Sequence, residues 1–188
     1  GYLLSKINFD ENSIIIETFT LNHGKYVGIV YGGSSKKQKK NFQIGNKILL
    51  NWKSKSENKI GYFNIELIKP VSPLFFDDKR KTICVLAAAS ILKILLPERQ
   101  INKQIFFSFE KLINQLNYED WIKSYIFWEL SLIKELGFEI NIFDRKRLKN
   151  SFNNIIEINS KSLTIPNILL KQKKKNISQA EIKEALIF

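Results

Sequence analysis

The sequence predicts an α+β fold in which a small barrel of strands is followed by an all-helical domain. From the first residue to about Pro73, β-branched and aromatic runs alternate with turn-forming residues. From Phe76 onward, the apolar residues recur at helical spacing instead. The 188 residues are enough for two small domains, each with its own core. We place these domains at residues 1–73 and 74–188.

Strand-like runs follow one another through the first domain. A glycine, asparagine or aspartate lies in every gap between runs, and Pro70 stops the last one. Five short strands with a long connection after the third predict a closed barrel, for which the OB-fold is the commonest architecture of this size. An SH3-like barrel is the alternative. The runs are, in order, "YLLSKINF", "SIIIETFTL", "KYVGIVYGG", "NKILLNWKSKS" and "KIGYFNIELIK".

Helices are predicted for most of the second domain. Asp77 or Asp78 can cap a helix that contains "KRKTICVLAAASILKILL", and Pro97 ends it. Two further segments, "INKQIFFSFEKLINQL" and "EDWIKSYIFWELSLIKELGF", carry apolar stripes that we interpret as bundle core, and Gly137 ends the second. The following stretch is polar, basic and only briefly strand-like. A last helix is expected from Ser178, which begins a capping-box pattern.

The composition narrows the function classes. The formal charge of +12 favours an anionic partner, with nucleic acid ahead of an acidic protein or an anionic membrane. The single cysteine, Cys84, excludes an internal disulfide and a cysteine-based zinc site. Phosphate-loop, dinucleotide, zinc-protease and nucleophile-elbow motifs are absent, so we expect neither an enzyme nor a cofactor. We also expect a cytoplasmic protein without a membrane span, of which the sequence is a fragment truncated at both ends.

One stretch of the barrel domain is strongly basic and has aromatic rings interleaved with its lysines. Between Gly24 and Lys59 there are nine lysines, opposed only by Glu57. Lysines displace counterions from a phosphate backbone, and aromatic faces can stack on unpaired bases. The competing interpretation is that the rings fill the barrel while the lysines only solvate it. The predicted DNA-binding residues are Lys25, Tyr26, Tyr31, Lys36, Lys37, Lys39, Lys40, Trp52, Lys53 and Lys55.

Several of these segments, in this order, resemble the bacterial recombination mediator family RecO. The stretch "ENSIIIETFTLNHGKYVGIVYGGSSKKQKKNFQIGN" is similar to the family's N-terminal barrel, and "LLPER" and "YIFWELSLIKELGF" to its helical domain. The resemblance implies an OB-fold and no catalytic activity. It implies binding and annealing of single-stranded DNA, binding of double-stranded DNA, and, with RecR, loading of RecA onto strands coated by single-stranded-DNA-binding protein (SSB). It further implies a contact with the C-terminal tail of SSB and a nucleoid-associated location.

Two departures from the family pattern matter. Many relatives carry arginines before the glycine pair and in the basic loop, where this chain has Tyr31 and lysines. Lysine keeps the charge but lacks the planar fork that binds phosphate through two hydrogen bonds. Some relatives also carry a zinc-binding cysteine cluster after "ELGF", whereas this chain has no cysteine there, so no metal is expected. Residues 144–147, "DRKR", are either a second phosphate contact or a solvated turn.

Two other functions remain open at this level. A small basic barrel also suits an RNA-binding module of the translation or ribosome machinery, although the helical half argues against it. A protein adaptor whose charge reflects only genomic composition is the third possibility, and it would not bind DNA even at low salt.

Overall fold

The computed structural model describes residues 1–35, 38, 41–54, 60–137, 155–158 and 161–164, the last two ranges by their backbone. The chain forms two compact units, Gly1–Asn114 and Gln115–Phe188. Within the described residues, no helix is both long and apolar enough to cross a membrane.

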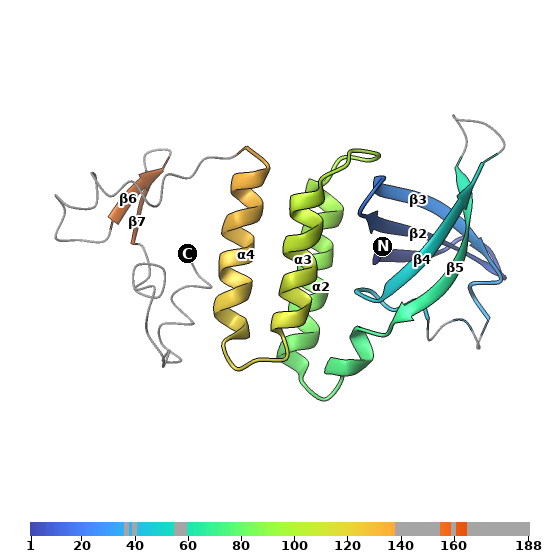
Figure 1. Ribbon diagram of the computed structural model, residues 1–188, viewed down its shortest axis with the longest axis horizontal. Coiled ribbons are helices and arrows are strands. Elements are labelled where there is room, and N and C mark those ends of the chain that lie inside the picture. Colours follow the sequence, from blue (N-terminus) through green and yellow to red (C-terminus); the bar gives the residue numbers. More distant parts are fainter. Residues whose placement is uncertain (36–37, 39–40, 55–59, 138–154, 159–160, 165–188) are drawn as a thin grey trace. The chain divides into compact units, whose positions relative to one another are not determined.

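The first unit begins with a closed five-stranded barrel (Figure 1). Around the barrel the strand order is β1-β2-β3-β5-β4, and every pairing is antiparallel except the parallel one between β3 and β5. This order and the five predicted strands confirm the α+β class and the OB-fold. The strands are β1 (Tyr2–Asn8), β2 (Ser13–Thr20), β3 (Gly24–Tyr31), β4 (Lys47–Lys53) and β5 (Gly61–Lys69).

Alternation along the strands separates the barrel's interior from its outer surface. Successive side chains of a strand point to opposite faces, so every second residue enters the core. Ile14 and Ile16 of β2, Val30 of β3, Ile48 of β4 and Phe63 of β5 are buried in one cluster. The residue after each of them therefore belongs to the outer face of the barrel.

Helices follow the barrel, with boundaries close to the predicted ones. Of the two candidate caps, Asp78 is the one used: its side chain accepts hydrogen bonds from the backbone N–H groups of Arg80 and Lys81. The first helix ends just before Pro97, as expected from the ring's inability to continue a helix. The elements are η1 (Ser72–Phe75), α2 (Lys79–Leu95), α3 (Lys103–Gln115) and α4 (Trp121–Glu135).

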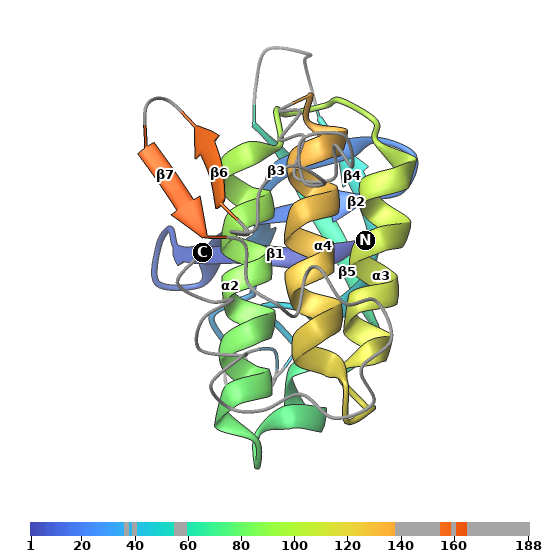
Figure 2. The ribbon, with the colours of Figure 1, turned by 90° about the vertical axis from the view of Figure 1, so that its left-hand side faces the viewer.

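Helices α2 and α3 pack against the barrel within the first unit. The Tyr2 ring lies 5.6 Å from the Phe106 ring and 5.1 Å from the Phe109 ring, centroid to centroid. Ala88 and Ala89 of α2 are fully buried. Figure 2, which looks onto the helices, shows both of them in front of the barrel strands. One side of the barrel is therefore covered by protein.

The second unit contains α4 and a short hairpin. Tyr125, Trp128 and Leu132 of the predicted α4 stripe are buried, as expected for core residues. Strands β6 (Ile155–Ile158) and β7 (Lys161–Thr164) pair antiparallel in the region where the sequence is only weakly strand-like. The predicted helix from Ser178 and the basic residues 144–147 lie outside the described residues.

Candidate nucleic-acid interface

A pair of tyrosine rings, Tyr31 exposed and Tyr62 half-buried, marks the outer face of the barrel. Tyr31, the last residue of β3, is 67% exposed, and its ring lies 6.0 Å from the ring of Tyr62 on β5. The two come together because β3 and β5 run parallel with Ile29 opposite Tyr62. Lys53 of β4 is exposed and opposite Tyr62 in the β4–β5 register. We call Tyr31, Lys53 and Tyr62 the outer patch.

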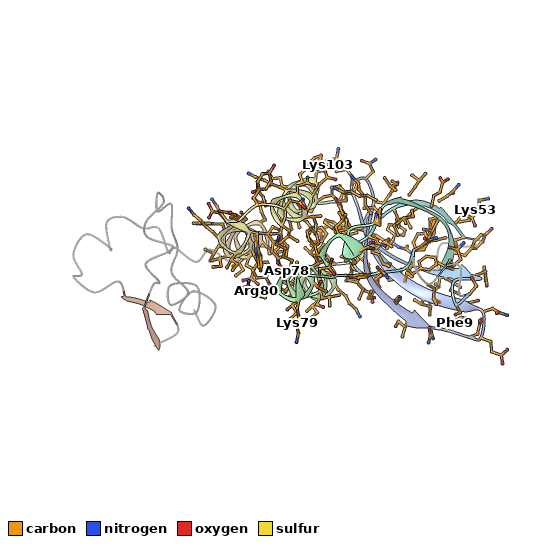
Figure 3. All side chains as sticks on the ribbon, turned by 90° about the horizontal axis from the view of Figure 1, so that it is seen from below. Phe9, Lys53, Asp78, Lys79, Arg80 and Lys103 are labelled. Atoms are coloured by element: carbon orange, nitrogen blue, oxygen red, sulfur yellow. The ribbon has the colours of Figure 1, made fainter. Side chains whose placement is uncertain are left out.

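The outer patch lies on the uncovered side of the barrel. Figure 3 shows Lys53 on the side of the barrel away from α2. Both connections that carry the remaining predicted lysines start next to the patch, one after Tyr31 and one after Lys53. The lysines themselves lie outside the described residues; they are Lys36, Lys37, Lys39, Lys40 and Lys55.

The other two predicted rings face the barrel interior. Tyr26 and Trp52 are half-buried, pack against the core cluster, and contact each other edge to face at 5.5 Å. A Cβ atom at Gly61 would overlap the Trp52 indole, so the glycine makes room for this ring. These contacts agree with the interpretation that the rings fill the barrel. Tyr26 and Trp52 are therefore less suited to base stacking than the outer patch.

Of the two predicted lysines that the structure describes, Lys25 lies inside the protein and Lys53 is exposed. Lys25 is 8% exposed, and its Nζ donates a hydrogen bond of 2.7 Å to the backbone carbonyl of Lys93 in the last turn of α2. A cation at this end of a helix is favourable because the last carbonyls carry partial negative charge. The Nζ of Lys93 in turn lies 3.3 Å from Glu17 of β2. Lys25 thus fastens the barrel to α2, and we leave it out of the interface.

A second polar contact fastens α3 to the barrel. Glu110 of α3 pairs with Lys47 at 2.5 Å and accepts a 3.0 Å hydrogen bond from the Tyr2 hydroxyl. The hydrogen bond from Lys47, followed by the one from Tyr2, lowers the pKa of Glu110 below its ordinary value. Burial, together with Glu110, raises the pKa of Tyr2. The Lys47 ammonium is therefore engaged within the fold.

The segment "QIGN", residues 43–46 at the end of the stretch that resembles the family's barrel, has a structural role. Asn46 is fully buried, and its Oδ1 accepts hydrogen bonds from the backbone N–H groups of Val71 and Ser72, at 2.9 and 3.1 Å. Its Nδ2 donates to the carbonyl of Asn41 at 3.1 Å. The side chain thereby joins the loop before β4 to the start of η1. This motif positions the barrel relative to the helices and does not face a ligand.

Sequence reasoning did not select Tyr62 as a contact residue. The signal was available in the alternation of β5, because Tyr62 must face away from the core if its neighbour Phe63 faces into it. Among the described residues, no three His, Cys, Asp or Glu side chains gather where they could hold a metal ion.

Comparison with known proteins agrees with this architecture. Residues 1–71 match the family model "Recombination protein O N terminal", and residues 77–187 match "Recombination protein O C terminal". The chain belongs to the RecO family. The boundary between the two RecO models falls just after β5, within the connection that contains η1.

Individual RecO relatives match over most of the chain. The DNA repair protein RecO of Roseobacter denitrificans is 31% identical over 141 residues, which are 74% of this chain and 58% of that protein. The DNA repair protein RecO of Ehrlichia chaffeensis is 31% identical over 164 residues, 86% of this chain and 66% of that protein. The DNA repair protein RecO of Cereibacter sphaeroides is 32% identical over 142 residues, which are 76% of this chain and 59% of that protein. The chain spans about three-fifths of the length of most of these RecO proteins.

Proposed function

We propose that this chain is a non-enzymatic, DNA-binding mediator of DNA repair and recombination, whose barrel holds single-stranded DNA on the outer patch. The observation that carries the proposal is the contact between the exposed Tyr31 ring and the half-buried Tyr62 ring beside Lys53, on the side of the barrel that α2 and α3 leave open. The names of the relatives, DNA repair protein RecO, support a role with DNA rather than with RNA.

The chemistry of the patch fits unpaired strands. Each base has an apolar face, and stacking on an aromatic side chain contributes roughly 1–3 kcal/mol per base without regard to sequence. Lys53 and the lysines of the two adjacent connections supply counterion release, which is also independent of sequence. Double-stranded DNA offers phosphates but no free base faces, so it binds through the charge alone and more weakly.

Annealing follows from the same two interactions. Neutralising phosphates lowers the repulsion between two complementary strands, and sequence-independent stacking lets a bound strand slide until it finds its complement. Neither step consumes a nucleotide, so the reaction requires no ATP, metal or other cofactor.

The roles with other proteins rest on membership of the RecO family. In this proposal the chain acts with RecR to load RecA onto DNA coated by SSB, binds the C-terminal tail of SSB, and works in the cytoplasm at the nucleoid. Residues 1–73 provide the DNA-binding module and residues 74–188 the helical module.

Substitution of the ring pair tests the proposal. The double variant Tyr31→Ala/Tyr62→Ala should bind a fluorescent oligothymidylate at least tenfold more weakly than the parent, because two stacking contacts of roughly 1–3 kcal/mol each are lost. It should also anneal complementary oligonucleotides more slowly in the absence of ATP. The matched control is Tyr118→Ala, which removes a 64% exposed tyrosine from the second unit and should bind like the parent.

Three outcomes would count against the proposal. Equal affinity of the parent and the double variant would reject the outer patch. A strong preference for structured RNA over single-stranded DNA would favour an RNA-binding module. Negligible DNA binding by the parent at low ionic strength would favour a protein adaptor.

A further inference from the structure

Arg99 lies in the connection between α2 and α3, which is fastened to the first residues of β3. The Arg99 N–H donates a 2.8 Å hydrogen bond to the carbonyl of Lys25, and Glu98 forms a parallel bridge with the same residue. Gly24 has a φ of +73°, and a Cβ atom there would overlap the backbone of Gln100. In Figure 1 this connection passes the end of the barrel where β3 begins. The backbone of Arg99 is therefore held firmly against the barrel.

The backbone of Arg99 is in a conformation that favours glycine. Its φ is +59°, and no other non-glycine residue in the described part of the chain has a positive φ. For a residue with a Cβ atom this region costs roughly 1–2 kcal/mol. A long cationic side chain thus occupies a position where glycine would fold with less strain. Strain of this kind is found most often at sites that bind ligands.

The guanidinium of Arg99 is pre-positioned and carries an uncompensated charge. Its Cζ lies over the Tyr26 ring, 5.6 Å from the ring centroid, in a cation–π contact. The residue is exposed, and no carboxylate of the described residues lies within ion-pair distance. An exposed guanidinium anchored on a ring in this way can offer two parallel hydrogen bonds to one phosphate.

We infer that Arg99 binds a phosphate of the nucleic-acid strand, as a contact separate from the outer patch. The inference rests on the proposed function and adds to it the planar fork that the lysine-rich loop lacks. The backbone of Lys25 holds Arg99 in place. Lys25 lies six residues before Tyr31 on β3, which is about 20 Å along an extended strand. A bound strand thus meets a stacking contact near one end of β3 and a phosphate contact near the other. Tyr26 supports the arginine and does not stack on a base.

The alternative is that the Arg99–Tyr26 contact only stabilises the fold, and the variant Arg99→Gly separates the two roles. Glycine relieves the strain at φ +59°, so thermal stability should stay within a few degrees of the parent or rise. Affinity for oligothymidylate at low salt should fall about five- to tenfold, because a hydrogen-bonded charged contact is lost. The slope of log affinity against log salt should become shallower by about 0.7, the value expected for one phosphate of a single strand.

Further variants fix the interpretation. Arg80→Ala removes an exposed arginine at the opposite end of α2 and should leave affinity closer to the parent than Arg99→Gly does. Arg99→Asn tolerates a positive φ and should reproduce the loss seen with glycine. Arg99→Lys keeps the charge but not the fork, so it should retain the parent's salt slope with a lower affinity.

Each result decides one point. Parent-like affinity and slope for Arg99→Gly, with binding by Tyr31→Ala/Tyr62→Ala reduced, would overturn the Arg99 contact alone. Parent-like affinity for Arg99→Lys would overturn the two-hydrogen-bond geometry. An equal loss from Arg80→Ala and Arg99→Gly would show that only net charge matters, which also overturns the site. Absence of DNA binding by the parent would overturn both the proposed function and this inference.

Discussion

The covered and open sides of the barrel use the same residue types for different purposes. On the covered side, Lys25 donates to a helix carbonyl, and in the barrel interior Tyr26 contacts Trp52 and Arg99. On the open side, Lys53 and Tyr31 are exposed. A count of lysines and aromatic rings treats the four residues alike. Strand alternation and the placement of α2 decide which of them can reach a ligand.

The comparison also separates the segments that carry the resemblance to the RecO family into two kinds. The asparagine of "QIGN" and the "LLPER" connection lie at the contacts between barrel and helices. The segment around "YGG" lies at the end of β3, beside the outer patch. Segments of the first kind hold the barrel against α2 and α3. The segment of the second kind lies on the open side, beside the outer patch.

The largest effect on the covered side is expected from Asn46→Ala. It removes three hydrogen bonds and leaves the buried N–H groups of Val71 and Ser72 without a partner. We expect the free energy of unfolding to fall by about 3–5 kcal/mol. Urea unfolding of Asn46→Ala measures this loss of stability. The control is Asn51→Ala, on the exposed face of β4, which should stay within about 0.5 kcal/mol of the parent. A loss below about 1 kcal/mol for Asn46→Ala would contradict the structural role of the asparagine.

A matched pair of lysine substitutions separates the two sides most cleanly. Lys25→Met and Lys53→Met each remove one positive charge, so their long-range effects on DNA are similar. Lys25→Met should lower the free energy of unfolding by about 2 kcal/mol, because a buried hydrogen bond from a charged donor is lost. Lys53→Met should leave stability unchanged but reduce the salt slope of oligothymidylate binding by about 0.7.

Urea unfolding and fluorescence anisotropy across a salt series check the two lysine variants. The reverse pattern, with Lys53→Met unstable and Lys25→Met defective in binding, would mean that the assignment of the two sides is wrong.

The smallest effect is the pH dependence at Glu110. Its pKa in the folded protein is lower than the unfolded value of 4.5, so its ion pair stabilises the fold above that pH. The contribution is lost as the pH falls below 4.5 through the folded pKa. Because both side chains of the ion pair are partly exposed to solvent, Glu110→Gln should remove only about 0.5–1 kcal/mol at neutral pH. The parent and the variant should therefore converge in stability in acid.

Unfolding of the parent, Glu110→Gln and the exposed control Glu66→Gln at pH 7 and at pH 3 measures this difference. A gap between the parent and Glu110→Gln that persists undiminished at pH 3 would exclude ionisation of Glu110 as its cause.

The architecture was predictable because its signals are local. The five strands have clear alternation and turn residues between them, and α2 is bounded by Asp78 and Pro97. Each of these features depends on neighbouring residues alone. The resemblance to the RecO family is confirmed by the family matches.

The candidate site was only partly predictable because it depends on contacts between distant segments. Alternation places Tyr26 and Tyr31 on opposite faces, but only the packed barrel shows that Tyr31 is the outer one. The pairing of Tyr31 with Tyr62 requires the parallel β3–β5 register. The burial of Lys25 requires the end of α2, which lies 68 residues further along the chain.

Photocrosslinking tests the central claim most directly. The account predicts that a single strand carrying 5-iodouridine crosslinks to Tyr31 and Tyr62, and that peptide mapping finds little product at Tyr26 or Trp52. Crosslinks concentrated at Tyr26 and Trp52, with none at the Tyr31–Tyr62 pair, would contradict it.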